Sequence, residues 1–135
     1  MKAVICDLDG TLALLNGRNP YDASTCEQDL LNKPVSVLVE ALQCHGYKII
    51  FVSGRFDTHR KETEQWLKNH NIKYHKLFMR QADDKRRDSI IKRELYEKEI
   101  KPNYNVEIVL DDRNQVVAMW RETGLTCLQV AEGNF

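Results

Sequence analysis

The stretch that decides the fold is AVICDLDGT, residues 3–11. An apolar run of strand length leads directly into two aspartates separated by one leucine. Because side chains alternate along a strand, Asp7 and Asp9 are expected to share one side at the strand's carboxyl end. In an open α/β sheet, ligands bind beyond that end of the strands. The stretch therefore predicts a buried strand that carries two carboxylates to a ligand site.

Strand-length and helix-period segments alternate along the rest of the chain. The predicted strands are residues 3–6, 48–52, 74–79, 107–110 and 127–130, and the predicted helices are residues 34–45, 58–70, 87–99 and 115–123. This order predicts an α/β fold, with a Rossmann-like parallel sheet of about five strands flanked by helices. We expect a single domain over residues 1–135, in which residues 12–33 form a long functional loop.

Composition argues against several classes of protein. The formal net charge is zero, so no overall basic field indicates a nucleic-acid partner. The four cysteines lie far apart and form no C-x-x-C pair, which argues against a zinc ribbon or a redox dithiol. The chain shows neither a signal segment nor an apolar run of about 18 residues. We therefore expect a soluble cytosolic protein that does not contact membranes.

Polar groups also follow two other predicted strands. Asp111 and Asp112 come after residues 107–110, and a third acid near Asp7 and Asp9 would suit Mg²⁺. A single aspartate at a strand end usually starts a turn or caps a helix. Two separate acidic clusters at equivalent strand ends favour a metal site.

Phosphate-binding groups follow the strand at residues 48–52, where Ser53, Gly54 and Arg55 supply a hydroxyl, flexible backbone and a guanidinium. Phosphoryl transfer also needs a cation opposite the metal. Residues 85–87 and Lys92 offer one, although the i,i+4 spacing of Asp88 and Lys92 on a predicted helix is by itself explained as well by a surface ion pair.

Taken in order, DLDGT at residues 7–11, Ser53, a lysine and Asp111-Asp112 resemble the four motifs of the haloacid dehalogenase (HAD) superfamily of phosphohydrolases. More closely, the chain resembles the 3′-phosphatase domains of phage polynucleotide kinase/phosphatases, through NGRNPYD at residues 16–22, SGR at residues 53–55, Asp88-x-x-x-Lys92 and DDRxQVVxMWR at residues 111–121. The resemblance spans the chain and implies a HAD fold. The two positions where a cap domain would be inserted have no room for one, so we expect an open site.

The resemblance implies a role for each matching residue. Asp7 would be the nucleophile that forms an aspartyl-phosphate, and Asp9 would be the general acid and base. The implied catalytic residues are Asp7, Asp9, Ser53 and Lys92, and the implied Mg²⁺ ligands are Asp7, Asp9 through its carbonyl, Asp111 and Asp112. The implied substrate-binding residues are Thr11, Arg18, Ser53, Gly54, Arg55, Asp88 and Lys92. Thr11 would help to position Asp9 and Asp88 would orient Lys92, while Lys85 lies near enough to compete with Lys92.

These roles predict a polynucleotide 3′-phosphatase that acts on DNA or RNA ends in the cytosol of a bacterium or a phage-infected host. No G-x-x-x-x-G-K-[ST] sequence is present, so we expect no kinase activity; a separate kinase or ligase is a possible partner, and the oligomeric state is open. A phosphatase of small nucleotides or other phosphomonoesters, a receiver-like module and a non-catalytic scaffold for phosphorylated ends are alternatives. Basic residues expected near the approach are Arg18, Arg55, Arg80, Lys85, Arg86 and Arg113. Among the tyrosines and tryptophans, only Tyr21 is expected to contact substrate, and Trp66 and Trp120 are expected to pack in the core.

Overall fold

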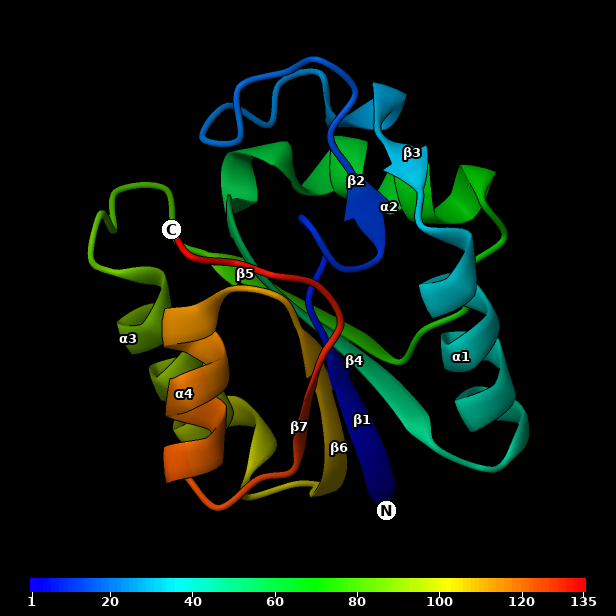
Figure 1. Cartoon of the computed structure of the whole chain (residues 1–135), viewed down its shortest axis with the longest axis vertical. Helices are drawn as coiled ribbons and strands as arrows, with labels where there is room; N and C mark the ends of the chain where they lie inside the picture. Colours follow the sequence, from blue (N-terminus) through cyan, green and yellow to red (C-terminus); the bar gives the residue numbers. More distant parts are fainter.

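The computed structural model describes all of residues 1–135 and contains one five-stranded parallel sheet between two layers of helices (Figure 1). The strands are β1 (Lys2–Cys6), β2 (Ala13–Leu14), β3 (Leu30–Leu31), β4 (Lys48–Phe56), β5 (Lys76–Arg80), β6 (Asn105–Asp111) and β7 (Cys127–Gln129). The helices are α1 (Lys33–Cys44), α2 (Arg60–Asn69), α3 (Asp88–Leu95) and α4 (Asn114–Glu122). The main sheet has the order β5-β4-β1-β6-β7, which confirms the predicted fold class.

The register of the sheet brings the predicted site residues to one edge. In β1, Cys6 lies opposite Phe51 of β4 and Leu110 of β6. One residue further along, Asp7 and Asp111 therefore lie at the same level, where the parallel strands end. In Figure 1 the β2–β3 hairpin and its loop lie above this carboxyl edge.

Each face of the sheet has its own apolar core. One core packs α1 and α2 against the sheet, and the other packs α3 and α4 against the opposite face (Figure 1). Central β1 contributes to both cores, because its alternate residues point to opposite faces. Its residues 3–6 are almost completely buried, which fixes the position of the adjoining DLDGT segment.

The structure differs from the sequence predictions at three places. Strand β4 continues to Phe56 rather than ending at residue 52, and its register against β5 shifts between Ser53 and Phe56. The helix predicted over residues 87–99 is α3 followed by a π-helical turn, Tyr96–Ile100, whose two end residues are buried. Residues 12–33, predicted as a loop, contain the antiparallel pair β2–β3 and a short 3₁₀ turn.

No helix of the chain has the length and apolar character needed to cross a membrane. None of the four cysteines forms a disulfide; three are buried, and Cys44 is exposed.

Candidate active site

The predicted nucleophile lies at the centre of the sheet edge and contacts a buried lysine. The Oδ1 atom of Asp7 accepts a 2.7 Å hydrogen bond from Nζ of Lys92, which reaches it from α3. The Lys92 side chain is 1% exposed, whereas Lys85 is exposed on the preceding loop. The helical spacing of Asp88 and Lys92 therefore does not belong to a solvated surface pair. Lys92, and not Lys85, is the lysine at the site.

Three buried carboxylates gather around Asp7. Asp7, Asp111 and Asp112 each offer an oxygen, and these oxygens lie within 4.8 Å of one another. Burial, followed by the charge of Asp111, raises the pKa of Asp7 well above its ordinary value, and burial also raises the pKa of Asp112. One ammonium facing three carboxylates leaves negative charge uncompensated. A cluster of hard oxygen ligands with excess negative charge fits Mg²⁺.

Both carboxylate oxygens of Asp111 accept hydrogen bonds. Lys92 and the indole N–H of Trp120 each donate to Oδ2 at 3.1 Å, and the backbone N–H of Asp112 donates to Oδ1 at 2.8 Å. The ring of Trp120 packs in the core beneath α4, as expected from the sequence. Its N–H also orients Asp111, an acidic residue of the candidate metal site. Helical periodicity does not predict the direction of this N–H.

The buried hydroxyl of Thr11 contacts carboxylates of the acidic cluster rather than Asp9. It donates toward Asp7 Oδ2 at 3.1 Å and Asp112 Oδ1 at 3.2 Å. The predicted help of Thr11 in positioning Asp9 is therefore not seen. Gly10, with φ of 84°, is needed beside Thr11, because a Cβ there would lie 2.2 Å from a carboxylate oxygen of Asp112.

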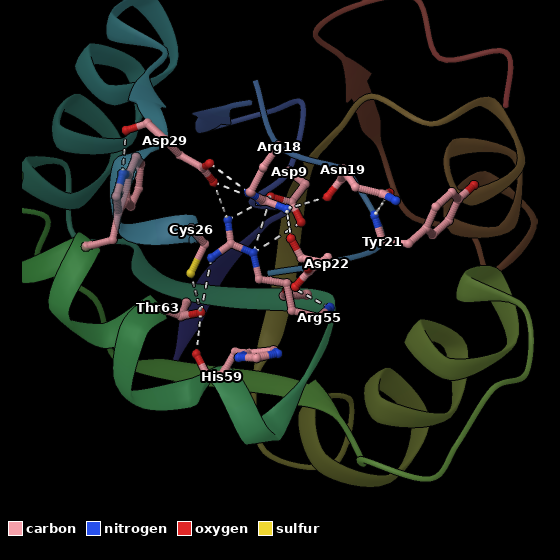
Figure 2. Close-up of polar contacts among 12 residues, drawn as sticks. Asp9, Arg18, Asn19, Tyr21, Asp22, Cys26, Asp29, Arg55, His59 and Thr63 are labelled. Atoms are coloured by element: carbon pink, nitrogen blue, oxygen red, sulfur yellow. Dashed lines mark hydrogen bonds and ion pairs between the residues drawn. The ribbon is translucent and has the colours of Figure 1, made fainter. Parts of the chain in front are cut away.

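The carboxylate of Asp9 lies apart from the cluster of Asp7, Asp111 and Asp112. It accepts hydrogen bonds from two arginines (Figure 2). Arg18 Nη2 and Arg55 Nη2 each donate to Asp9 Oδ1 at 2.7 Å. The same two guanidiniums bind Asp29, through Arg18 Nε at 2.8 Å and Arg55 Nη2 at 3.0 Å. Two cations and two carboxylates thus form a balanced network that is mostly buried.

In this network Arg18 and Arg55 contact Asp9 and Asp29, and their contact with substrate stays a prediction. Their side chains are only 5% and 2% exposed and turn inward, toward Asp9 and Asp29. Burial alone would raise the pKa of Asp9, but the hydrogen bonds and charges of Arg55 and Arg18 outweigh it and lower the pKa. The arginines therefore hold Asp9 in its ionised form.

Asp29 was not predicted from the sequence. It follows the 3₁₀ turn before β3, and its backbone carbonyl accepts a 2.8 Å hydrogen bond from the indole N–H of Trp66 in α2. Thr63, also in α2, accepts from Arg55 Nη1 at 3.1 Å. The sequence contains only an indirect indication of Asp29. Two arginines near the buried end of a sheet need carboxylates to balance their charge, and the loop at residues 12–33 contains several acidic residues.

Asp88 begins α3 and lies against the Ser53-Gly54-Arg55 segment. Its carboxylate is 3.7 Å from Nζ of Lys92 and 3.4 Å from Arg80 Nη2. A Cβ on Gly54 would lie 2.2 Å from Asp88 Oδ1, so only glycine allows this approach. Ser53 is buried, and its hydroxyl oxygen accepts from the backbone N–H of Arg55 at 3.1 Å.

The other predicted basic residues lie nearer the surface. Arg86 is exposed and pairs with Asp84 and Glu94. Arg113 lies 3.8 Å from Asp88, so it is brought to the site, whereas Arg86 is committed to surface ion pairs.

Comparison with known proteins gives a match over the full length of the chain. The family model described as the polynucleotide kinase PNKP phosphatase domain, of the HAD type, matches residues 1–135. The chain belongs to this family. As a member of the polynucleotide kinase phosphatase family, it is a HAD phosphatase domain.

Relatives of this family place the domain within larger proteins. The chain is 41% identical over 124 residues to a protein named as a bifunctional polynucleotide kinase/RNA ligase from Autographa californica nuclear polyhedrosis virus, covering 90% of the chain and 18% of that protein. It matches chains in structures of a Pnkp1/Rnl/Hen1 complex and of the Pnkp1/Rnl/Hen1 RNA repair complex, each at 56% identity, with a TM-score of 0.97 and 99% of this chain covered. It spans 47% and 43% of those two chains, which is less than half of each.

Proposed function

We propose that this chain is a polynucleotide 3′-phosphatase that works through an aspartyl-phosphate on Asp7 and requires Mg²⁺. One observation carries the proposal: a buried aspartate, Asp7, accepts a hydrogen bond from Lys92 at a sheet edge that no cap domain covers, and the carboxylate two residues further on is bound by two arginines. Asp7 would attack the phosphorus through a carboxylate oxygen, and the bond from phosphorus to the 3′ oxygen would break. Asp9, after taking up a proton from solvent, would give that proton to the 3′ oxygen.

The second step returns the enzyme to its starting state. Asp9, held ionised by Arg18 and Arg55, would take a proton from water while that water attacks the phosphorus of phospho-Asp7. Inorganic phosphate leaves, and Asp7 is again a carboxylate. Proton donation in the first step requires Asp9 to gain a proton once substrate is bound, because the two arginines favour its ionised form.

Lys92 and the acidic cluster would stabilise the negative charge of the phosphoryl group in different ways. The ammonium of Lys92, 2.7 Å from Asp7, would hold phosphoryl oxygens together with Ser53. Asp7, Asp111 and Asp112 would hold Mg²⁺, with the carbonyl of Asp9 as a further ligand. When bound, Mg²⁺ would supply positive charge that stabilises the transferring phosphoryl group.

RNA ends are the substrate that we propose first, because the relatives are named for RNA ligation and RNA repair. DNA ends are the alternative substrate, with which RNA ends are compared in the test below. A ligase, and a kinase on a separate domain or chain, are the proposed partners, since this chain lacks a G-x-x-x-x-G-K-[ST] loop. A cytosolic location stays a prediction.

The test measures phosphate release from a 3′-phosphorylated RNA oligonucleotide, its DNA counterpart and a 3′-mononucleotide, with Mg²⁺ or with chelator. The enzymes are the wild type, Asp7→Asn and, as a matched control, Asp83→Asn, which removes an equivalent charge from an exposed residue without an ion pair. We expect Mg²⁺-dependent release that favours oligonucleotides and is lost only in Asp7→Asn. A faster rate with the mononucleotide would instead indicate a general nucleotidase, and no release from any substrate would favour a receiver-like or scaffold role.

A further inference from the structure

Tyr21 is the most exposed aromatic residue of the chain, and the site described above does not use it. Its exposed fraction is 77%, compared with 61% for Phe135, and every other aromatic residue is half-buried or buried. Its hydroxyl makes no hydrogen bond, and its ring points away from the arginine network into solvent (Figure 2). A large ring left in water forgoes the stabilisation that burial would give.

The backbone beneath this ring is held in place. The N–H of Tyr21 donates to the side-chain oxygen of Asn19 at 2.9 Å, and the N–H of Ser24 donates to Asp22 Oδ1 at 2.9 Å. Pro20 precedes Tyr21, and the proline ring fixes the φ angle of Pro20. The backbone therefore loses little conformational entropy when the ring meets a ligand.

The same segment is joined to the predicted general acid and base. Nη1 of Arg18 donates to the carbonyl of Asn19 at 3.3 Å and to that of Asp22 at 3.1 Å, so its bonds flank Tyr21 on both sides. Nη2 of Arg18 donates to Asp9 at 2.7 Å. Tyr21 is thus presented at the rim of the site, on a loop fixed to Asp9 through one arginine (Figure 2).

The charges around Tyr21 favour a flat base over a backbone phosphate as its partner. Arg18, the only cation of residues 16–22, is turned inward and occupied by carboxylates. Asp22 is exposed and would repel a phosphate. An exposed aromatic face can still stack on any nucleobase, because every base has a π-face.

We propose that Tyr21 is a stacking platform for a nucleobase within the last two nucleotides of a 3′-phosphorylated strand. This inference rests on the proposed function and names how that site would prefer a polynucleotide to a small phosphomonoester. Stacking holds the strand while its terminal phosphate reaches Asp7.

The experiment compares kcat/KM for a 3′-phosphorylated oligonucleotide with kcat/KM for p-nitrophenyl phosphate. The variants are Tyr21→Ala, Tyr21→Phe and Val37→Ala, the last a control that trims an exposed apolar side chain on α1. We expect the ratio of the two values to fall about tenfold in Tyr21→Ala, the effect of losing one stacked base. Tyr21→Phe should keep most of the ratio because the ring is retained, and Val37→Ala should keep all of it.

Abasic substrates locate the contact. The wild type and Tyr21→Ala are compared on oligonucleotides that lack the terminal base or the penultimate base. If Tyr21 stacks on the missing base, the loss of kcat/KM caused by Tyr21→Ala and the loss caused by removing that base do not add. On that abasic substrate, Tyr21→Ala should then lower kcat/KM by less than about threefold. Equal losses on the intact and both abasic substrates, or no loss on any, would overturn the inference while leaving the proposed function intact. No phosphate release from any oligonucleotide by the wild type would overturn both.

Discussion

Replacing Asp29 with asparagine tests whether the arginine network holds the site together. Asp29 binds Arg18 and Arg55, and the three side chains are at most 5% exposed. Asparagine has nearly the same size but no charge, so two buried guanidiniums would then share only Asp9. Removing one partner of a buried ion pair costs about 3–5 kcal/mol, and we expect about 3 kcal/mol because asparagine keeps one acceptor oxygen.

For a chain of this length, a loss of about 3 kcal/mol corresponds to a melting temperature about 10 °C lower. We also expect kcat to fall at least about tenfold, because the two arginines that orient Asp9 would lose the second carboxylate that holds them in place. Thermal unfolding measures the first effect. Phosphate release, assayed well below both melting temperatures, measures the second separately from unfolding.

The matched control for this experiment is Asp83→Asn, in which an exposed aspartate without an ion pair loses the same charge. It should melt like the wild type. If Asp29→Asn melted within about 2 °C of this control and retained full activity, the network would contribute neither stability nor orientation, and the reasoning would be refuted.

Three further variants test other contacts. Trp120→Phe removes the N–H that binds Asp111, and we expect Mg²⁺ affinity to fall at least about tenfold in a calorimetric titration. Gly54→Ala places a Cβ against Asp88, and we expect about 2 kcal/mol of destabilisation in urea unfolding, partly reversed by adding Asp88→Ala. The raised pKa of Asp7 means that its charge destabilises the metal-free fold as pH rises through that pKa. In chelator at neutral pH, Asp7→Asn should therefore melt above the wild type, with the gap closing on acidification; an unchanged gap would contradict this.

The sequence predicts the parts of the fold and site that depend on local pattern. Apolar runs of strand length predict the parallel sheet, and the carboxyl ends of parallel strands necessarily meet at one edge, so the sequence pattern alone brings Asp7 and Asp111 together. The end of β4 was less predictable. Its continuation to Phe56 depends on pairing with β5, which local residues do not encode.

Contacts that depend on the course of a loop or the direction of a polar atom could not be predicted. Asp29 reaches Arg55 only because the β2–β3 hairpin folds back over the sheet edge, and neither residue spacing nor composition specifies that path. Periodicity placed Trp66 and Trp120 in the core, where their rings do lie. It carries no information about where an indole N–H points.

Those two indoles give the protein a built-in optical reporter. The chain has only two tryptophans, and both donate hydrogen bonds at the site, one to the backbone of Asp29 and one to the carboxylate of Asp111. Their intrinsic fluorescence should therefore respond to events at the sheet edge without any attached dye. Single-tryptophan variants would separate the two signals, because Trp66 lies beneath the arginine network and Trp120 beneath the acidic cluster.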